Sequence, residues 1–421
     1  MTTPARIPFP VVDEVSRHCL QEEEPETVHI EVHLPGRLDP ARMRKAFTEA
    51  LHRHPRILMR EAAGGWYRRR YEWELTENPD VEVVSFPAPG RSALRDARTR
   101  ALAAAPPLSL SPPIRLEVVE DTHNTTVLFL TINHTALDGP ACLRILATAA
   151  EIYGGKDNSP TAAPIRPPDP PQSTDAPSNW TRPARVAPGS PEISPGNGLL
   201  VTELPLPHRP KGSPYTVNDQ LMVTTALTIA HWNREHGQSP RPLRITMPVD
   251  DRPRDMTMPI GNGTRLVEVP FSPTELTHKP EDMPDLLRRT AQRTRALKSL
   301  IRPQLGHGAG LLTAPVTPVT WRAALTRGLR RAAAPWTSTT LLSNIGRIPY
   351  PLDFGEEAGR AHAVWFSAPA RMPRGLTVTT ASTAGRLHLA LRWSRTLLGH
   401  GDGHHLRDLF EHYLHTTEAA P

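Results

Sequence analysis

The stretch Leu128–Leu146 reads LFLTINHTALDGPACLRIL and places a histidine four residues before an Asp-Gly pair. A histidine ring that is held in a fixed orientation is the most versatile proton acceptor near neutral pH. A carboxylate at the following turn can cap the next helix or pair with a cation, and glycine suits a turn that needs positive φ. His134, Asp138 and Gly139 are therefore candidate catalytic residues. The alternative is a structural histidine at the ordinary polar turn between two buried elements.

Regular elements must position this histidine. The apolar run predicts a strand over about 126–132, and the periodic segment after it predicts a helix over 140–153 that ends at a Gly-Gly pair. Upstream, apolar residues alternate over 28–34 as in a half-buried strand, and Asp39 followed by proline is typical of a helix N-cap. The motif thus follows the end of a strand, inside an N-terminal half that spans residues 1–155.

A proline-rich segment divides the chain. Eleven of the 43 residues in 156–198 are proline, which is typical of a stiff, extended linker. The C-terminal half, 199–421, is predicted to hold an edge strand near 199–206, a helix over 218–236 and a hairpin that pairs 376–380 with 387–393. Strands and helices do not alternate strictly, so we expect an α/β fold of the α+β kind, with a two-layer sandwich in each half.

Composition excludes several classes of protein. Two cysteines, Cys19 and Cys142, supply neither a disulfide framework nor a metal quartet. The histidine-rich stretch at 400–405 has glycine-rich spacing that sets no rigid ligand geometry, so no metal is expected. No apolar run reaches the roughly 18 residues that a membrane helix needs, and the N-terminus lacks the apolar core of a signal peptide. We therefore expect a cytoplasmic chain without a membrane span.

The formal net charge is +6, and basic residues concentrate between 281 and 335, where ten Lys and Arg face three Asp and Glu. Such a segment suits a phosphate-bearing or acidic partner, and a solvated helix face is the equal alternative. No aromatic interleaving or nucleic-acid motif accompanies it, so nucleic acid is not an expected partner.

The heptapeptide NHTALDG resembles the His-His-x-x-x-Asp-Gly signature of the chloramphenicol-acetyltransferase-like superfamily, which includes nonribosomal peptide condensation domains, polyketide-associated acyltransferases and wax-ester synthases. Further blocks follow in the superfamily's order, namely GRLDPARMRKAFTEALHRHPRIL, YTVNDQLMVTTALTIA, MPVDDRPRDMTMPIGNGT and LLSNIGRIP. The resemblance covers the chain outside the linker. It implies two halves that form a V around a tunnel, acyl transfer from a pantetheine thioester, no bound cofactor, and a site completed by a monomer.

The resemblance also implies roles for single residues. His134 matches the second histidine of the signature, which is the general base, and Asn133 stands in place of the first. Asp138 is expected to form a structural ion pair with an arginine of the other half, for which Arg252 in the Asp-Asp-Arg-Pro block is the candidate.

Polar residues of both halves are assigned to substrate binding on the same ground: Asn133, Asn262, Ser343 and Asn344. Ser343, Asn344 or backbone N–H groups near Gly139 are candidates for stabilising an oxyanion. The Asp-Phe-Gly at 353–355 begins like another superfamily motif and then departs from it, so we assign it no role.

The resulting hypothesis is a stand-alone acyltransferase or condensation enzyme of specialised metabolism. It would join an acyl group from acyl-CoA, or from a 4'-phosphopantetheinyl carrier protein, to a hydroxyl or amine of a small molecule. Two alternatives stay open: a catalytically silent condensation-like domain that recruits partners, and an enzyme of the same fold that carries out an epimerisation or a cyclisation.

Overall fold

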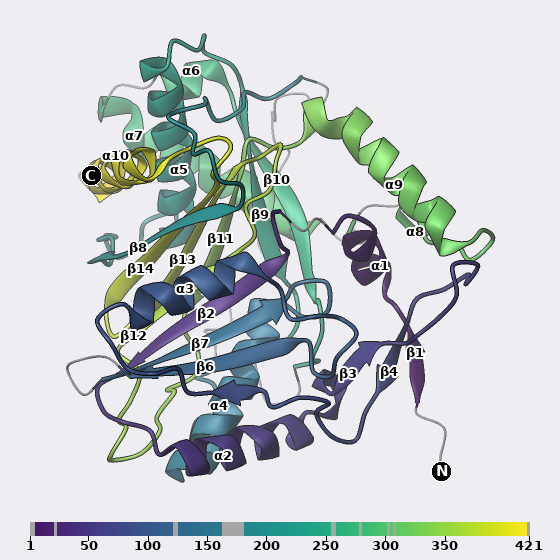
Figure 1. The fold of residues 1–421 in the computed structure, drawn as a ribbon. Coiled ribbons are helices and arrows are strands. Elements are labelled where there is room, and N and C mark those ends of the chain that lie inside the picture. The colour runs from purple at the N-terminus through teal and green to yellow at the C-terminus, as the bar shows by residue number, and fades with distance from the viewer. Residues whose placement is uncertain are drawn as a thin grey trace.

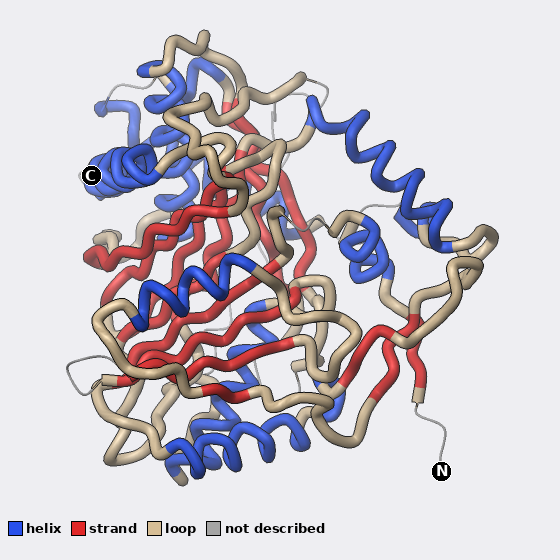
Figure 2. Tube along the Cα trace, in the orientation of Figure 1, coloured by secondary structure: helices blue, strands red, loops and turns tan. Residues whose placement is uncertain are grey.

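The computed structural model describes residues 5–20, 23–120, 125–161, 181–253, 258–277, 280–300, 304–305 and 309–418. In Figure 1, two large sheets lie one above the other, the lower one mostly from the N-terminal half and the upper one from the C-terminal half. Helices pack against both sheets (Figure 2). The expected α/β sandwich in each half is confirmed.

The described strands of the lower sheet have the order β12-β2-β7-β6-β5. Their bounds are Thr27–Leu34 for β2, Val84–Ser85 for β5, Ile114–Glu120 for β6, Thr126–Asn133 for β7 and Ala363–Ser367 for β12. The helices of this half are α2 (Pro40–Arg53), α3 (Ala93–Ala103) and α4 (Gly139–Gly154).

The side chains of β7 alternate between two buried faces. Leu130 belongs to the core that contains α2 and α4, whereas its neighbour Phe129 packs in the small cluster beneath α3. Burial on both faces explains why this strand reads as an uninterrupted apolar run. The predicted strand and helix on either side of the histidine motif are both confirmed.

The described strands of the upper sheet have the order β10-β9-β11-β13-β14-β8. Their bounds are Asn197–Pro205 for β8, Leu243–Asp250 for β9, Thr264–Phe271 for β10, Thr340–Arg347 for β11, Leu376–Thr383 for β13 and Arg386–Ser394 for β14. Its helices are α5 (Val217–Glu235), α6 (Pro273–Leu276), α7 (Met283–Ser299) and α10 (His400–Glu418).

Two predictions for this sheet are confirmed. β13 and β14 form the expected hairpin, with Leu376 opposite Trp393, and β8 lies at the edge. The hairpin turn places Ala384 and Gly385 at φ 50° and 77°, the left-handed pair that a two-residue turn between twisted strands requires.

One strand of the C-terminal half joins the lower sheet. β12 comes from the C-terminal half but pairs with β2, placing Val364 opposite Val32, and it also lies beside β13 and β14. The predicted linker is likewise part of the fold at its end, where Trp232 Nε1 donates to the carbonyl oxygen of Ala187 at 2.9 Å. Residues 162–180 of that linker lie outside the described residues.

A third group of elements flanks both sheets on the right of Figure 1. It consists of α1 (Val11–His18), α8 (Ala309–Leu312), α9 (Val319–Ala333) and a small sheet of β1 (Arg6–Pro8), β4 (Glu72–Leu75) and β3 (Met59–Glu61). Single 3-10 turns occupy Pro55–Ile57, Pro280–Asp282 and Ala334–Trp336. No helix in the described ranges is long and apolar enough to cross a bilayer.

Two arginines of the basic segment form buried ion pairs. Arg322 of α9 donates to Glu14 of α1 at 2.7 Å, and both side chains are buried. Arg293 of α7 pairs with Glu275 at 2.9 Å, also buried. The charge excess at the surface of this segment is therefore smaller than its composition indicates.

Candidate active site

A cavity of about 660 Å³ lies between the two halves. Six of the residues singled out from the sequence line it: His134, Asp138, Gly139, Asn262, Ser343 and Asn344. Asn133 and Arg252 are absent from its described lining. The tertiary structure thus brings together polar residues from the start of α4, from the loop before β10 and from β11.

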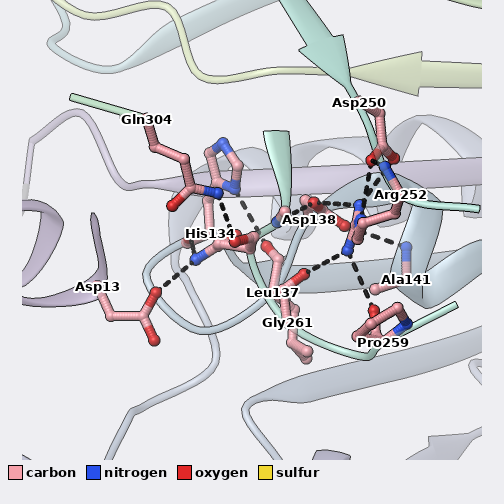
Figure 3. Close-up of polar contacts among 12 residues, drawn as sticks. Asp13, His134, Leu137, Asp138, Ala141, Asp250, Arg252, Pro259, Gly261 and Gln304 are labelled. Atoms are coloured by element: carbon pink, nitrogen blue, oxygen red, sulfur yellow. Dashed lines mark hydrogen bonds and ion pairs between the residues drawn. The ribbon is translucent and has the colours of Figure 1, made fainter. Parts of the chain in front are cut away.

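His134 lies in the short loop between β7 and α4, and its side chain is half-buried. Its backbone N–H donates to the carbonyl oxygen of Glu26 at 2.8 Å. Ring Nδ1 is 3.0 Å from the carbonyl oxygen of Leu137 (Figure 3). A carbonyl oxygen only accepts, so Nδ1 carries the hydrogen and Nε2 of the neutral ring holds the lone pair.

Asn133 serves the loop rather than the cavity. Its Nδ2 donates to the carbonyl oxygen of Pro106 at 2.9 Å, and its Oδ1 accepts from the backbone N–H of Thr135 at 3.1 Å. The amide is buried and both of its ends are occupied. Asn133 lines a neighbouring cavity and not the one that His134 lines.

Asp138 is the N-cap of α4 and joins the two halves. Its Oδ1 accepts from Ala141 N at 3.1 Å, and its Oδ2 accepts from Arg252 Nη2 at 2.7 Å and from Gly263 N at 2.9 Å. Arg252 in turn donates to Asp250 at 2.9 and 2.8 Å (Figure 3). A carboxylate from one half and an arginine from the other thus form one buried network.

Burial and charge act in opposite directions on this network. Burial raises the pKa of Asp138, while Arg252 and the two backbone N–H donors lower it. Burial alone would lower the pKa of Arg252, but its hydrogen bond with Asp250 and the charge of Asp138 raise it above the ordinary value. The guanidinium therefore stays charged, and its donors are satisfied further by the carbonyl oxygens of Pro259 and Gly261 at 3.2 and 3.1 Å.

Asn262 holds the histidine loop from the other half. Its Nδ2 lies 3.1 Å from the carbonyl oxygen of His134, 3.0 Å from that of Thr135 and 3.0 Å from Asp13 Oδ1. Three acceptors around one nitrogen fix the orientation of the amide. Asn262 is therefore placed to position His134 through the backbone.

Asp13 of α1 is a residue that the sequence did not indicate. Besides Asn262 it accepts from Trp73 Nε1 at 2.9 Å. Burial raises the pKa of Asp13 to about 6, against the opposing effects of Asn262, Trp73 and more distant cations. The carboxyl sits in a short helix with no motif around it, so only the packing of α1 against the loop reveals it.

The residues assigned to oxyanion stabilisation differ in whether the protein already occupies their hydrogen-bonding groups. Asn344 donates to Asn218 Oδ1 at 3.3 Å and accepts from Gly346 N at 2.9 Å, where the pairing of β11 with β13 shifts register. The side-chain amide of Asn344 thus stabilises the irregular part of β11. Ser343 lines the cavity beside it.

The expectation that Gly139 adopts a positive φ is wrong. Gly139 is the first residue of α4 and is not among the described glycines with positive φ. A Cβ at this position would instead lie 3.1 Å from a ring carbon of Phe366 in β12. The glycine permits the close approach of β12 to the start of the helix.

The described residues contain no group of three or more His, Cys, Asp or Glu arranged to hold a metal ion. The histidine-rich stretch at 400–405 opens α10, where Asp402 Oδ2 accepts from Gly399 N at 2.8 Å and from Ser190 N at 2.6 Å. Asp402 is the third residue of the helix, and its carboxylate satisfies the backbone N–H of the residue that precedes the helix.

The fold is similar to that of solved condensation domains and of an acetyltransferase. The condensation domain of the monacolin K polyketide synthase aligns with a TM-score of 0.63 at 12% identity, over 99% of this chain and 98% of that one. Trichothecene 15-O-acetyltransferase from Fusarium sporotrichioides aligns with a TM-score of 0.65 at 11% identity, over 98% and 95%. A starter condensation domain of rhizomide synthetase, in complex with C8-CoA, aligns with a TM-score of 0.65 at 14% identity, over 100% and 96%.

In sequence, the chain is 28% identical over 385 residues to an uncharacterized protein of Mycobacterium tuberculosis that is present in two strains. The alignment covers 82% of this chain and 84% of that protein. No family model matches the sequence. The comparisons therefore establish the fold.

Proposed function

We propose that the protein transfers an acyl group from a pantetheine thioester to a hydroxyl or amine, with His134 as the general base. The observation that carries the proposal is the His134 ring itself. Nδ1 faces the Leu137 carbonyl oxygen, and no described residue hydrogen-bonds Nε2, on the wall of a cavity that both halves line. A neutral imidazole in this tautomer accepts a proton through Nε2.

In the proposed reaction, Nε2 takes the proton of the acceptor as its oxygen or nitrogen attacks the thioester carbonyl. The carbonyl π electrons move to oxygen and give a tetrahedral oxyanion. We assign its stabilisation to the hydroxyl of Ser343 or the backbone N–H of Gly139, because both residues line the cavity. Collapse of the intermediate breaks the C–S bond, and the thiolate takes the proton back from the imidazolium. No acyl-enzyme forms, and positioning of the two substrates supplies much of the rate acceleration.

The donor is proposed to be acyl-CoA or the phosphopantetheine arm of a carrier protein. The fold supports this choice because the aligned rhizomide domain is a complex with C8-CoA. The acceptor is proposed to be a small molecule of specialised metabolism. Asp138 and Arg252 act in this scheme as positioning residues, because their buried network holds the loop that carries His134.

The test replaces His134 by Gln, which removes the proton acceptor and keeps a polar side chain. Wild-type protein and variant are incubated with octanoyl-CoA and a panel of alcohols and amines, and thiol release and acylated product are measured by absorbance and mass spectrometry. We expect a fall of about 10²- to 10⁴-fold in acceptor-dependent transfer, the range for loss of a general base. The melting temperature should stay the same.

His52→Gln, at an exposed position on α2, is the matched control and should retain full activity. Transfer by His134→Gln at a rate close to wild type would reject the base role. A new product formed without thiol release would favour epimerisation or cyclisation, and neither product nor thiol release would favour a recruitment domain.

A further inference from the structure

The cavity contains two arginines that have no carboxylate partner among the described residues, Arg330 of α9 and Arg374 of the segment between β12 and β13. Arg374 Nε donates to Ser338 Oγ at 2.8 Å. No described residue accepts from its Nη1 or Nη2. The Arg374 side chain is half-buried and lines the cavity, so these two nitrogens are available to a group that binds there.

The two carboxylates whose charge acts on Arg374, Glu26 and Glu268, already form ion pairs with other arginines. Glu26 pairs with Arg371, and Glu268 pairs with Arg244 at 3.0 Å. Burial lowers the pKa of Arg374 to about 10; Glu268 opposes this, while Arg330 and Arg371 add to it. The guanidinium is therefore charged at neutral pH, and this end of the cavity carries an excess of positive charge.

A half-buried charge without a carboxylate partner is costly to a folded protein unless a ligand supplies the opposite charge. The planar fork of a guanidinium matches the paired oxygens of a carboxylate or phosphate. We propose that Arg330 and Arg374 form an anion subsite of the cavity that binds a carboxylate or phosphate group of a substrate. The proposal deepens the proposed function, because it takes the cavity as the place where substrates bind.

The test measures binding rather than turnover, by isothermal titration calorimetry with ligand pairs that differ mainly in an anionic group. Succinyl-CoA against butyryl-CoA probes a carboxylate on the acyl group. Coenzyme A against pantetheine probes the phosphates of the donor. The third pair, 10-hydroxydecanoate against 1,10-decanediol, probes a carboxylate on an alcohol acceptor. The pair that shows a preference identifies the source of the anion.

We expect wild-type protein to bind the anionic member of at least one pair more tightly, and Arg374→Met to weaken that member by about 10-fold or more without weakening the neutral one. Arg330→Met should act in the same direction. Arg331→Met, an exposed neighbour on α9 that is not among the described lining residues, is the matched control and should leave binding unchanged. No preference in any pair, or a preference that survives in Arg374→Met, overturns the proposal.

Stability gives a second readout. Removal of a charge that serves a ligand should leave the melting temperature of the ligand-free protein unchanged or higher. A fall of several degrees in Arg374→Met would show that the guanidinium is a structural group and would also overturn the proposal. An anion preference without acyl transfer would retain the subsite and reject the proposed function, so the two failures are distinguishable.

Discussion

Leu137 contributes its carbonyl oxygen, not its side chain, to the candidate site, and this oxygen decides which nitrogen of His134 accepts a proton. The Leu137 side chain is buried in the core, so the backbone that carries the oxygen is held in place. The pattern His-x-x-x-Asp-Gly indicated the histidine but not the tautomer. The tautomer follows from the loop geometry between β7 and α4.

At the same scale, we predict that replacing Asp138 destabilises the protein. Replacement by Ala removes the N-cap of α4 and one partner of buried Arg252, which keeps Asp250. Breaking a buried ion pair costs about 3–5 kcal/mol, and we expect the lower end of that range because Asp250 still neutralises the guanidinium. Chemical denaturation measures the change, and acyl transfer should fall with it.

Asp138→Asn is the comparison for this prediction, since its side-chain oxygen can still cap the helix while the charge is lost. It should destabilise the protein less than Asp138→Ala does. An Asp138→Ala protein with the wild-type free energy of unfolding would show that the network with Arg252 does not hold the two halves together.

At the scale of elements, the position of α9 is held by an ion pair with α1. Arg322 donates to Glu14 and to the carbonyl oxygens of Thr317 and Arg69 at 2.6 and 2.9 Å, so this one side chain anchors the start of α9. The outer face of α9 is exposed, with Trp321 68% accessible, and the other polar contacts of the helix are single hydrogen bonds such as Thr326 Oγ1 with His18 Nδ1 at 3.3 Å.

We therefore expect Arg322→Met to loosen α9. It leaves Glu14 buried without its cation, and hydrogen exchange over residues 319–333 should accelerate by at least 10-fold. The double variant Glu14→Leu with Arg322→Met removes both charges and should recover part of the protection. Equal exchange in the wild type and in Arg322→Met would show that α9 is held by its other contacts.

At the scale of the whole molecule, buried histidines govern stability in mild acid. Burial lowers the pKa of His18 to about 4, of His29 to about 3 and of His54 to about 4. The unfolded chain binds protons near pH 6.5 while the folded chain does not, so stability is lost as the pH falls below 6.5. Asp13 acts oppositely, because its pKa is raised to about 6 and the folded state binds its proton first. Burial also raises the pKa of Glu14 and Asp138, but it lowers the pKa of three further histidines, His231, His362 and His388. Six histidines outweigh three carboxyls, so the protein should be less stable at pH 5 than at pH 7.

His29→Leu tests this account. His29 is fully buried and neither ring nitrogen has a partner in the described structure. Its loss should reduce the fall in unfolding free energy between pH 7 and pH 5 by about 2 kcal/mol, since each pH unit below 6.5 contributes about 1.4 kcal/mol per proton. Urea titrations at both pH values measure the difference, with exposed His52→Leu as the control. An unchanged pH dependence would contradict the prediction.

Local patterns in the sequence determined the elements next to the site and the histidine that follows β7. The apolar run of β7, the Asp-Gly-Pro start of α4 and the β13–β14 hairpin depend on contacts between residues close in the chain, which periodicity and turn residues report. The ordered blocks also led to the fold.

Only the tertiary structure decided which distant groups meet. The pairing of β12 with β2, the packing of Asp13 against Asn262 and the two arginines left without carboxylates inside the cavity depend on contacts between residues far apart in sequence. A side chain's partner and its burial are properties of the folded chain, because residues without a local pattern acquire a role only when packing removes water and brings another group to them.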